Sequence, residues 1–484
     1  MHKINTFDVF DTLIARRCIF PLKIFELVEK KSGFRNFAQM RRNSELKIIS
    51  GVYTMQDIYA HFSVDYGVDP ATARALMEME IAEELENVIP IKENLEMVRD
   101  GDLLISDMYL PKEIILKLLA KSGLNKEVEL IVTNHGKGHG YIWPDLQKNL
   151  HVGVHLGDNP QADLKSPQAS GIRGEVVNQW ALTNHEQFVF DNGYQMLAQL
   201  AREVRLGTRT LEHGMTRYQE TSLQYSHNIP ILIMAACSIY KYAAECGIDT
   251  ILFSGRDCFF LKKYYDVIFN KNKNFTTHYF YTSRISRMKG SESYEKYFKS
   301  LANGSTLVVD LCGTGWSLSQ LYAKVGLSPR TYLVQFDQDN KIYDPLGRGQ
   351  EQYKFDYLNI NIPAKNIILE MLNQVDHGML EDVIALEEYG AFIPVFEETD
   401  YPKPVADFVG DIRMIHEYAV EAIGNFDGDA LIAELLGVAE KNSEMVKLLS
   451  IDLNEKRDFL KDIDAYHTRH NNHTLHLMRL PPKD

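Results

Sequence analysis

Short apolar runs in the first third of the chain end in residues that could carry out phosphoryl chemistry. Asp8 follows one run, Ser106 ends a second, and Asp158 and Asp163 follow a third, while Lys137 lies in a glycine-rich segment. An aspartate can attack phosphorus as a nucleophile, and carboxylate oxygens are ligands that Mg²⁺ prefers. A serine hydroxyl can hydrogen-bond a phosphoryl oxygen, and a lysine can neutralise its charge. The set predicts Mg²⁺-dependent chemistry on a small phosphorylated metabolite.

These residues must be positioned by an open parallel sheet. The apolar runs alternate with helical patterns, which is typical of an α/β fold. In such sheets ligands bind at the carboxyl ends of the strands, where all of these residues fall. A long helical pattern, residues 21–98, interrupts the alternation after the first strand. The strands are expected at 4–10, 102–106, 128–133 and 152–157.

The order of these motifs resembles the haloacid dehalogenase-like (HAD) superfamily of hydrolases. Thr12 stands four residues after Asp8, the spacing of that family's first motif, and is a candidate substrate-binding residue. The resemblance implies that Asp8 is the nucleophile and forms an aspartyl-phosphate. It covers residues 1–180, with a Rossmann-like domain and a helical cap at about 15–98.

The resemblance also implies roles for the later motifs. Ser106 and Lys137 match the residues that hold the phosphoryl group, so that Asp8, Ser106 and Lys137 form the catalytic set. Asp158 and Asp163 match the acidic motif that holds Mg²⁺ together with Asp8. An alternative for Asp163 is that it serves the loop and a neighbouring lysine.

One position departs from the phosphatases of this family. They carry a second aspartate two residues after the nucleophile as general acid and base, and this chain has Phe10 there. A phenyl ring cannot protonate a leaving group or activate water. A catalytically silent binding or regulatory protein on the same fold is therefore an alternative to a phosphatase.

A second candidate site follows the predicted strand at residues 306–310. Asp310 ends that strand, and a turn containing Thr314, Gly315 and Ser317 leads into a helix, which makes a phosphate cradle. The pattern resembles the phosphoribosyl-diphosphate loop of type I phosphoribosyltransferases, although Val309 replaces the first of that family's paired acids. Phosphoribosyl transfer or binding is therefore a second functional hypothesis.

A neighbouring strand adds two further candidates for this site. Arg256 and Asp257 follow the predicted strand at 250–254, where an arginine suits an anionic ligand. Strands are also expected at 277–282 and 331–336, which completes a second α/β pattern. The predicted domains are therefore the HAD-like domain at 1–180, a helical connector at 181–224, a phosphoribosyltransferase-like domain at 225–400 and a helical region at 401–484. Four histidines near the end of the chain are predicted to lie on a solvated tail, namely His467, His470, His473 and His476.

Composition narrows the classes of partner. The chain of 484 residues has 52 Lys and Arg against 66 Asp and Glu, a formal charge of −14, which disfavours binding to nucleic acid. Its most apolar helical stretch, residues 229–240, is shorter than a membrane span and predicts a buried core helix. Five scattered cysteines and the absence of a secretory pattern at the N-terminus favour a cytoplasmic protein without disulfides. The oligomeric state stays open.

Overall fold

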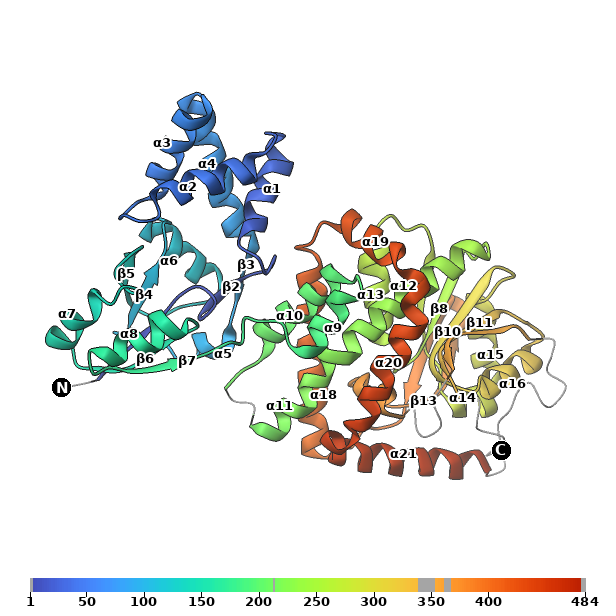
Figure 1. Cartoon of the computed structure of the whole chain (residues 1–484). Coiled ribbons are helices and arrows are strands. Elements are labelled where there is room, and N and C mark those ends of the chain that lie inside the picture. The colour runs from blue at the N-terminus through green and yellow to red at the C-terminus, as the bar shows by residue number, and fades with distance from the viewer. Residues whose placement is uncertain (1–2, 212–213, 338–352, 361–366, 480–484) are drawn as a thin grey trace. The chain divides into compact units, whose positions relative to one another are not determined.

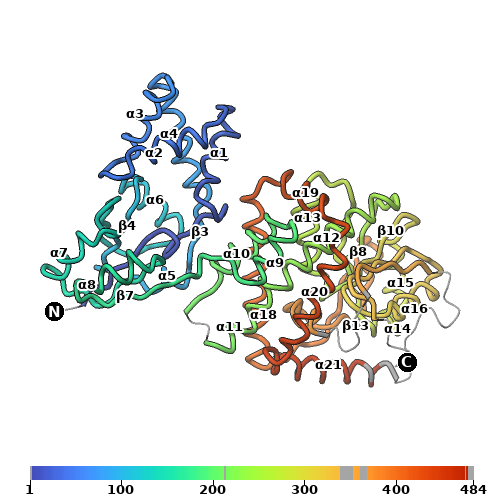
Figure 2. Tube along the Cα trace, viewed as in Figure 1, coloured from blue at the N-terminus to red at the C-terminus, as the bar shows by residue number. Residues whose placement is uncertain are grey.

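The computed structural model describes residues 3–211, 214–337, 353–360 and 367–479. The chain folds into two compact units, which are treated separately below (Figures 1 and 2). Unit 1 comprises Met1–Asn184 with Arg202–His213, and unit 2 comprises His185–Ala201 with Gly214–Asp484.

Unit 1 is built on a five-stranded sheet in the order β5-β4-β1-β6-β7. Every neighbouring pair is parallel, which confirms the predicted parallel α/β architecture. In chain order the strands run 3-2-1-4-5, so the order reverses between β1 and β6, where doubly wound sheets bind ligands. The strands are β1 (Ile4–Phe7), β4 (Leu103–Asp107), β5 (Glu129–Thr133), β6 (Val152–Gly157) and β7 (Arg173–Val176). The connecting helices are α5 (Lys92–Leu95), α6 (Lys112–Lys121), α7 (Ile142–Asn149), the π-helical turn η1 (Pro160–Lys165) and α8 (Ser166–Ala169).

A helical block separates β1 from β4, as the sequence predicts. A short antiparallel pair of strands, in which Ile14 pairs with Pro90, frames the block where the chain enters and leaves it. Local signals set the helix starts, because Thr54 and Asp57 form a capping box and Asp69 caps a helix whose first residue is Pro70. The elements are β2 (Ile14–Arg16), α1 (Leu22–Ser32), α2 (Phe37–Ile48), α3 (Met55–Tyr66), α4 (Pro70–Asn87) and β3 (Val88–Pro90).

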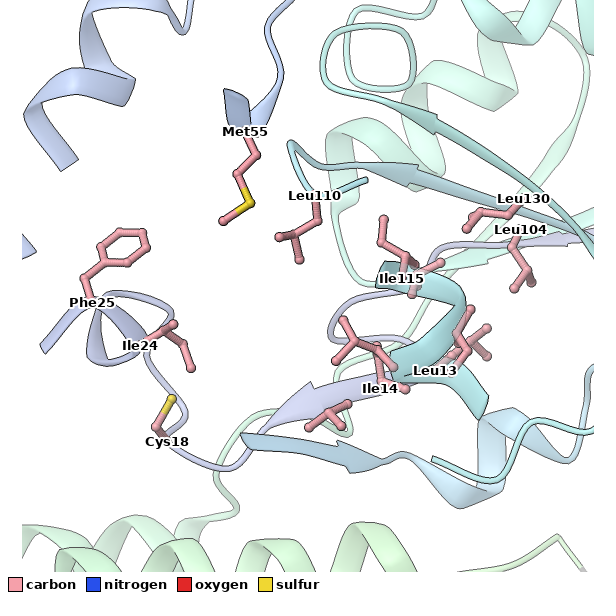
Figure 3. Close-up of a cluster of buried hydrophobic side chains, with 14 of the residues drawn as sticks. Leu13, Ile14, Cys18, Ile24, Phe25, Met55, Leu104, Leu110, Ile115 and Leu130 are labelled. Carbon is pink, nitrogen blue, oxygen red and sulfur yellow. The ribbon is translucent and has the colours of Figure 1, made fainter. Parts of the chain in front are cut away.

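One hydrophobic cluster joins the helical block to the sheet. It includes Phe25 of α1 and Met55 of α3 together with Leu110 and Ile115 near α6, all of them buried. Figure 3 shows Met55 reaching toward Leu110. Burying one such side chain stabilises the fold by about 1.5–3 kcal/mol. The shared core therefore holds the block in a fixed position over this part of unit 1.

The helical block also contains a charged pair with no access to solvent. The guanidinium of Arg41 donates hydrogen bonds of 2.8 and 2.9 Å to the carboxylate of Glu80, and both side chains are 0% exposed. The hydroxyls of Tyr59 and Tyr109 donate to the same carboxylate at 2.6 and 3.0 Å. The network is paired and hydrogen-bonded, as buried charges need to be.

Unit 2 contains a second five-stranded parallel sheet, in the order β12-β11-β10-β8-β9. In chain order the strands run 2-1-3-4-5, so the reversal here lies between β8 and β10. The strands are β8 (Thr250–Ser254), β9 (Thr276–Phe280), β10 (Thr306–Gly313), β11 (Arg330–Phe336) and β12 (Phe355–Ile360). The helices along the sheet are α13 (Phe259–Phe269), α14 (Arg284–Lys289), α15 (Glu292–Leu301), α16 (Trp316–Val325) and α17 (Ile367–Leu372), followed by a hairpin of β13 (Leu380–Leu386) and β14 (Ala391–Phe396).

Helices make up the rest of the chain. The apolar stretch 229–240 lies in α12 and is buried from Ile229 to Ile239, so the predicted core helix is confirmed. No helix in the described part of the chain combines the length and the apolar character that a membrane crossing requires. These helices are α9 (Asn184–Asp191), α10 (Gln195–Thr208), α11 (Met215–Leu223), the π-helical turn η2 (Gln224–Asn228), α12 (Ile229–Glu245), α18 (Lys403–Ile423), α19 (Gly428–Gly437), α20 (Asn442–Glu455) and α21 (Lys461–Arg479).

Candidate functional site

The predicted site residues of unit 1 meet at one edge of its sheet. Asp8 directly follows β1, Ser106 lies near the end of β4, Lys137 comes shortly after β5, and Asp158 directly follows β6. The amide of Asp8 donates a 2.8 Å hydrogen bond to the carbonyl of Leu156, which fixes the end of β1 against β6. The parallel sheet thus brings together residues that are up to 150 positions apart in the chain.

Asp8 is the buried centre of this site. Its side chain is paired with the ammonium of Lys137, and its second oxygen accepts a 3.1 Å hydrogen bond from the Thr12 hydroxyl. Asp8 and Lys137 are only 5% and 4% exposed. Burial raises the pKa of Asp8, although the charge of Lys137 opposes the rise. Burial acts to lower the pKa of Lys137, but Asp8 and Asp163 outweigh it and raise that pKa, so the lysine stays charged.

Asp163 is held by several partners at once. Its Oδ1 lies 2.9 Å from Lys137 Nζ and 2.9 Å from His155 Nε2, and its Oδ2 accepts a 2.8 Å hydrogen bond from the Asn159 amide. His155 is fixed in turn by the hydroxyl of Thr6, at 2.8 Å. Burial acts to raise the pKa of Asp163, but the hydrogen bond from His155 and the charge of Lys137 lower it to about 2. These contacts favour the alternative in which Asp163 positions the lysine and the loop.

Asp158 lacks such support. In the described part of the chain no hydrogen bond or ion pair reaches its side chain, which is half-buried. Burial, followed by the charges of Asp8, Asp11 and Asp163, raises its pKa to about 7. One oxygen each from Asp8, Asp158 and Asp163 lie within 4.8 Å of one another. A hard divalent cation with oxygen ligands fits this donor set, because it would offset the repulsion between the carboxylates.

The glycine-rich loop that contains Lys137 is held in place by Asp107, a residue that the sequence analysis did not select. The carboxylate of Asp107 accepts hydrogen bonds from the amides of Lys137 and Gly138, at 3.1 and 2.8 Å. The indole of Trp143 donates to the Lys137 carbonyl at 3.1 Å. For Asp107, the only signal in the sequence was its position next to Ser106 at the end of a strand. Ser106 itself is 2% exposed.

Phe10 has a structural role in the loop that follows Asp8. The guanidinium of Arg16 lies 4.6 Å from the centre of its ring, within the range of a cation–π interaction. Arg16 is fixed by two 2.8 Å hydrogen bonds to Glu84 of the helical block. Asp11 adopts a left-handed backbone conformation, φ 58°, and burial raises its pKa. The residue in the general-acid position is thus packed against a buried ion pair.

In unit 2 the second candidate set also gathers at the point where the strand order reverses. Arg256 and Asp257 follow β8, and Asp310 lies in β10, which pairs with β8. Arg256 has a left-handed φ of 62°, and its amide donates a 2.6 Å hydrogen bond to the hydroxyl of Tyr279. A strained non-glycine residue at a strand end is a common feature of ligand sites.

Arg287, which the sequence analysis missed, connects this set. Its guanidinium donates to the carboxylate of Asp310 and the hydroxyl of Ser317, both at 3.1 Å, and to Ser254 at 3.3 Å. The hydroxyl of Thr314 accepts a 3.2 Å hydrogen bond from the amide of Trp316, the first residue of α16. Gly315, the residue before α16, has φ 71°, and an added Cβ there would lie 2.4 Å from Phe355.

Carboxylates and histidines from later in the chain complete this site. Burial raises the pKa of Asp257 to about 6 and that of Glu370 to about 8. His467 Nε2 lies 3.6 Å from the Glu370 carboxylate, and His470 Nε2 lies 3.4 Å from the Arg256 guanidinium. The predicted solvated tail is therefore wrong for His467, which is 5% exposed, because α21 packs along this edge with that face turned inward. His473 on the same helix is exposed as predicted.

Comparisons with known proteins do not assign this chain to a family. No model of a known protein family matches this chain, and no curated protein sequence matches it. The fold shows an α/β protein with two parallel sheets, and in each sheet polar side chains gather where the strands end.

Proposed function

We propose that unit 1 is a HAD-like, Mg²⁺-dependent hydrolase that acts on a small phosphorylated metabolite, a sugar phosphate or a nucleotide, through an aspartyl-phosphate. The observation that carries the proposal is the buried Asp8 paired with Lys137, beside an Asp158 that has no cationic partner of its own in the described part of the chain. A nucleophile, a fixed positive charge and an incomplete cation site are the parts that phosphoryl transfer needs.

In this mechanism a carboxylate oxygen of Asp8 attacks phosphorus, and the bond from phosphorus to the leaving oxygen breaks. Lys137 and the hydroxyl of Ser106 hold the phosphoryl oxygens while charge develops on them. Water then attacks the aspartyl-phosphate, which releases phosphate and restores the carboxylate of Asp8. A divalent ion held by Asp8 and Asp158 would supply further charge neutralisation.

Whether the leaving group needs a proton determines which substrates this site can hydrolyse quickly. Phe10 cannot donate one. We therefore expect the fastest turnover for substrates whose leaving group departs without a proton, such as an acyl phosphate or an aryl phosphate. For a sugar phosphate or a nucleotide the proton has to come from the substrate itself or from water, so these are expected to react more slowly.

An assay with p-nitrophenyl phosphate and Mg²⁺ tests the proposal. Asp8→Asn keeps the size and the hydrogen-bonding shape of the side chain but removes the nucleophile, so activity and acid-stable labelling from ³²P-acetyl phosphate should both disappear. Asp145→Asn is the matched control, since it makes the same change at an exposed aspartate of α7 outside the site and should keep activity. Activity that persists in Asp8→Asn would exclude Asp8 as nucleophile, and an inactive wild type would favour the silent binding protein.

A second candidate function belongs to unit 2. The contact of Arg287 with both Asp310 and Ser317 favours a preformed loop for the phosphate of a phosphoribosyl ligand. Calorimetry with phosphoribosyl diphosphate tests it, with binding expected for the wild type and lost in Asp310→Ala. No binding at millimolar ligand would count against this function and would leave the proposal for unit 1 untouched.

A further inference from the structure

Unit 2 contains a cluster of two histidines and an aspartate that lies apart from both sites described above. His185 comes from the first turn of α9, His227 from the π-helical turn η2, and Asp452 from α20. The two imidazoles point at one carboxylate oxygen, with His185 Nε2 at 2.8 Å and His227 Nε2 at 2.7 Å from Asp452 Oδ2. All three belong to unit 2, and they join helices that are far apart in the chain.

The geometry of the cluster matches a ligand set for a transition metal. The three ligand atoms lie within 4.8 Å of one another, and the imidazole rings are tilted by 57° with centres 4.7 Å apart. Two nitrogens and one carboxylate oxygen are typical of sites for zinc or another first-row divalent ion that keep one position open. Mg²⁺ and Ca²⁺ prefer oxygen ligands only, so this set selects against them.

Residues around the cluster orient these ligands. Ser226 Oγ lies 2.6 Å from His227 Nδ1, which leaves Nε2 directed at Asp452. Lys456 Nζ lies 3.4 Å from the other carboxylate oxygen, Oδ1, so Oδ2 is the oxygen turned to the histidines. A hydrogen-bonded second nitrogen is usual for a metal-binding histidine. The π-helical turn that carries His227 is a rare form that is frequently found at functional sites.

The proton requirement of the cluster also supports a cation. The Ser226 hydroxyl has one proton, and its oxygen lies 2.7 Å from the Ser222 carbonyl. If it donates there, a neutral His227 must donate from Nδ1, and its Nε2 lone pair then faces Asp452 Oδ2. A cation between these two lone pairs resolves the conflict.

We propose that His185, His227 and Asp452 bind one zinc-class divalent ion that fastens α9 to η2 and α20. Zinc bonds of about 2.0–2.2 Å in a tetrahedral arrangement place neighbouring ligand atoms about 3.3 Å apart. The ligand atoms therefore have to separate by about 0.5 Å from their present distances. His185 and Asp452 have room for this, since their side chains are 35% and 34% exposed, whereas His227 is buried at 1%. The site is independent of the function proposed for unit 1.

Zinc content and zinc affinity of the full-length chain test this proposal. The untagged protein is stripped with chelator, loaded with Zn²⁺ in excess Mg²⁺ to keep the acidic site of unit 1 occupied, and desalted before elemental analysis. One bound zinc per chain is expected for the wild type. Asp452→Asn keeps the size of the side chain and can still hydrogen-bond the imidazoles through its oxygen and its amide, but it is a poor metal ligand, so it should lose that zinc and weaken affinity at least tenfold.

Two further variants make the outcome interpretable. His185→Ala removes a partly exposed ligand and should also lose the zinc, while His61→Ala removes an exposed histidine from unit 1 and should keep it. Titration with Co²⁺ should give a visible absorption band in the wild type and in His61→Ala only. If the wild type retains no zinc, or if folded Asp452→Asn and His185→Ala retain it, the cluster is a set of hydrogen bonds and the proposal is overturned.

Discussion

Lys137 Nζ lies 2.9 Å from Asp163 Oδ1, and the same oxygen lies 2.9 Å from His155 Nε2. Asp163 therefore faces two donors that compete with any cation for its charge, whereas Asp158 faces none in the described residues. The two acids that follow β6 are thus suited to different tasks. Asp163 contacts the lysine, and Asp158 is the acid that we propose as the metal ligand.

Substitutions of these two acids should separate the tasks. Asp158→Asn should raise the Mg²⁺ concentration for half-maximal phosphatase activity by about 10–100-fold, because a charged ligand is lost. Asp163→Asn should lower kcat through a misplaced Lys137 and leave the Mg²⁺ requirement within about threefold of the wild type. Mg²⁺ titrations of both variants check this. An equal shift in the two variants would make Asp163 a metal ligand.

The general-acid position offers a gain-of-function test. Phe10→Asp should speed hydrolysis of alkyl phosphates by about 100-fold or more, the usual contribution of a positioned acid. Aryl phosphates should change little, because their leaving group needs no proton. Phe10→Asn is the control, since it also removes the contact with Arg16 but supplies no acid. An equal response of the two variants on alkyl phosphates would contradict the interpretation.

The buried pair of Arg41 and Glu80 should matter for stability. Glu80→Gln removes the fully buried carboxylate that pairs with Arg41 and leaves the guanidinium only Glu45, at 2.9 Å, which is expected to cost about 3 kcal/mol of unfolding free energy. Glu26→Gln removes the carboxylate of an exposed pair with Lys23, so its effect should stay below about 1 kcal/mol. Urea unfolding followed by circular dichroism measures both. Similar losses of unfolding free energy in the two variants would mean that burial does not determine how much an ion pair contributes to stability.

His416 gives unit 2 a sensitivity to acid. The ring is fully buried, stacks on Phe260 with centres 3.9 Å apart, and shares a 2.6 Å hydrogen bond with the hydroxyl of Tyr264. Burial lowers its pKa to about 3. Between the ordinary histidine pKa of about 6.5 and this value, the unfolded chain binds a proton that the folded chain excludes. Stability should therefore fall with falling pH, by about 1.4 kcal/mol per pH unit from this residue.

Unfolding of His416→Gln across pH 7 to 4 isolates this effect. The other buried histidines are present in both chains, so their contributions cancel in the difference. The variant is expected to be less stable than the wild type at pH 7, and the gap should narrow as the pH falls. A gap that stays constant would mean that His416 binds a proton in the folded state.

The strands that carry the predicted sites could be located from the sequence because they are buried and apolar. Asp102–Ser106 was expected and β4 runs from Leu103 to Asp107, while β8 matches its predicted range, Thr250–Ser254. Edge strands such as β7 and the pair β2 and β3 were missed. They are short, and their pairing depends on residues far away in the chain, so local periodicity does not indicate them.

The contacts that complete each site were harder to predict. Arg287 and Glu370 lie in helices whose pattern alone gives no hint that one face borders a sheet edge. His467 follows the same rule, since only the packing of α21 shows that it is buried. His185, His227 and Asp452 come from three separate helices, so no spacing along the sequence connects them. Motifs within one strand and the loop that follows it could be predicted from the sequence, whereas contacts between separate elements could not.

The position of β1 at the centre of its sheet affects how the chain folds during synthesis. β1 pairs with β4 and β6, and the hydrogen bond between Thr6 and His155 spans 149 positions. The first strand must therefore emerge from the ribosome and remain unpaired while α1–α4 are made, although those helices can form from local contacts. Both edges of this apolar strand are open to wrong partners until β4 is made, and one edge stays open until β6 follows. The segment that carries Asp8 is thus made before both strands that flank it and is enclosed only when β6 has been added.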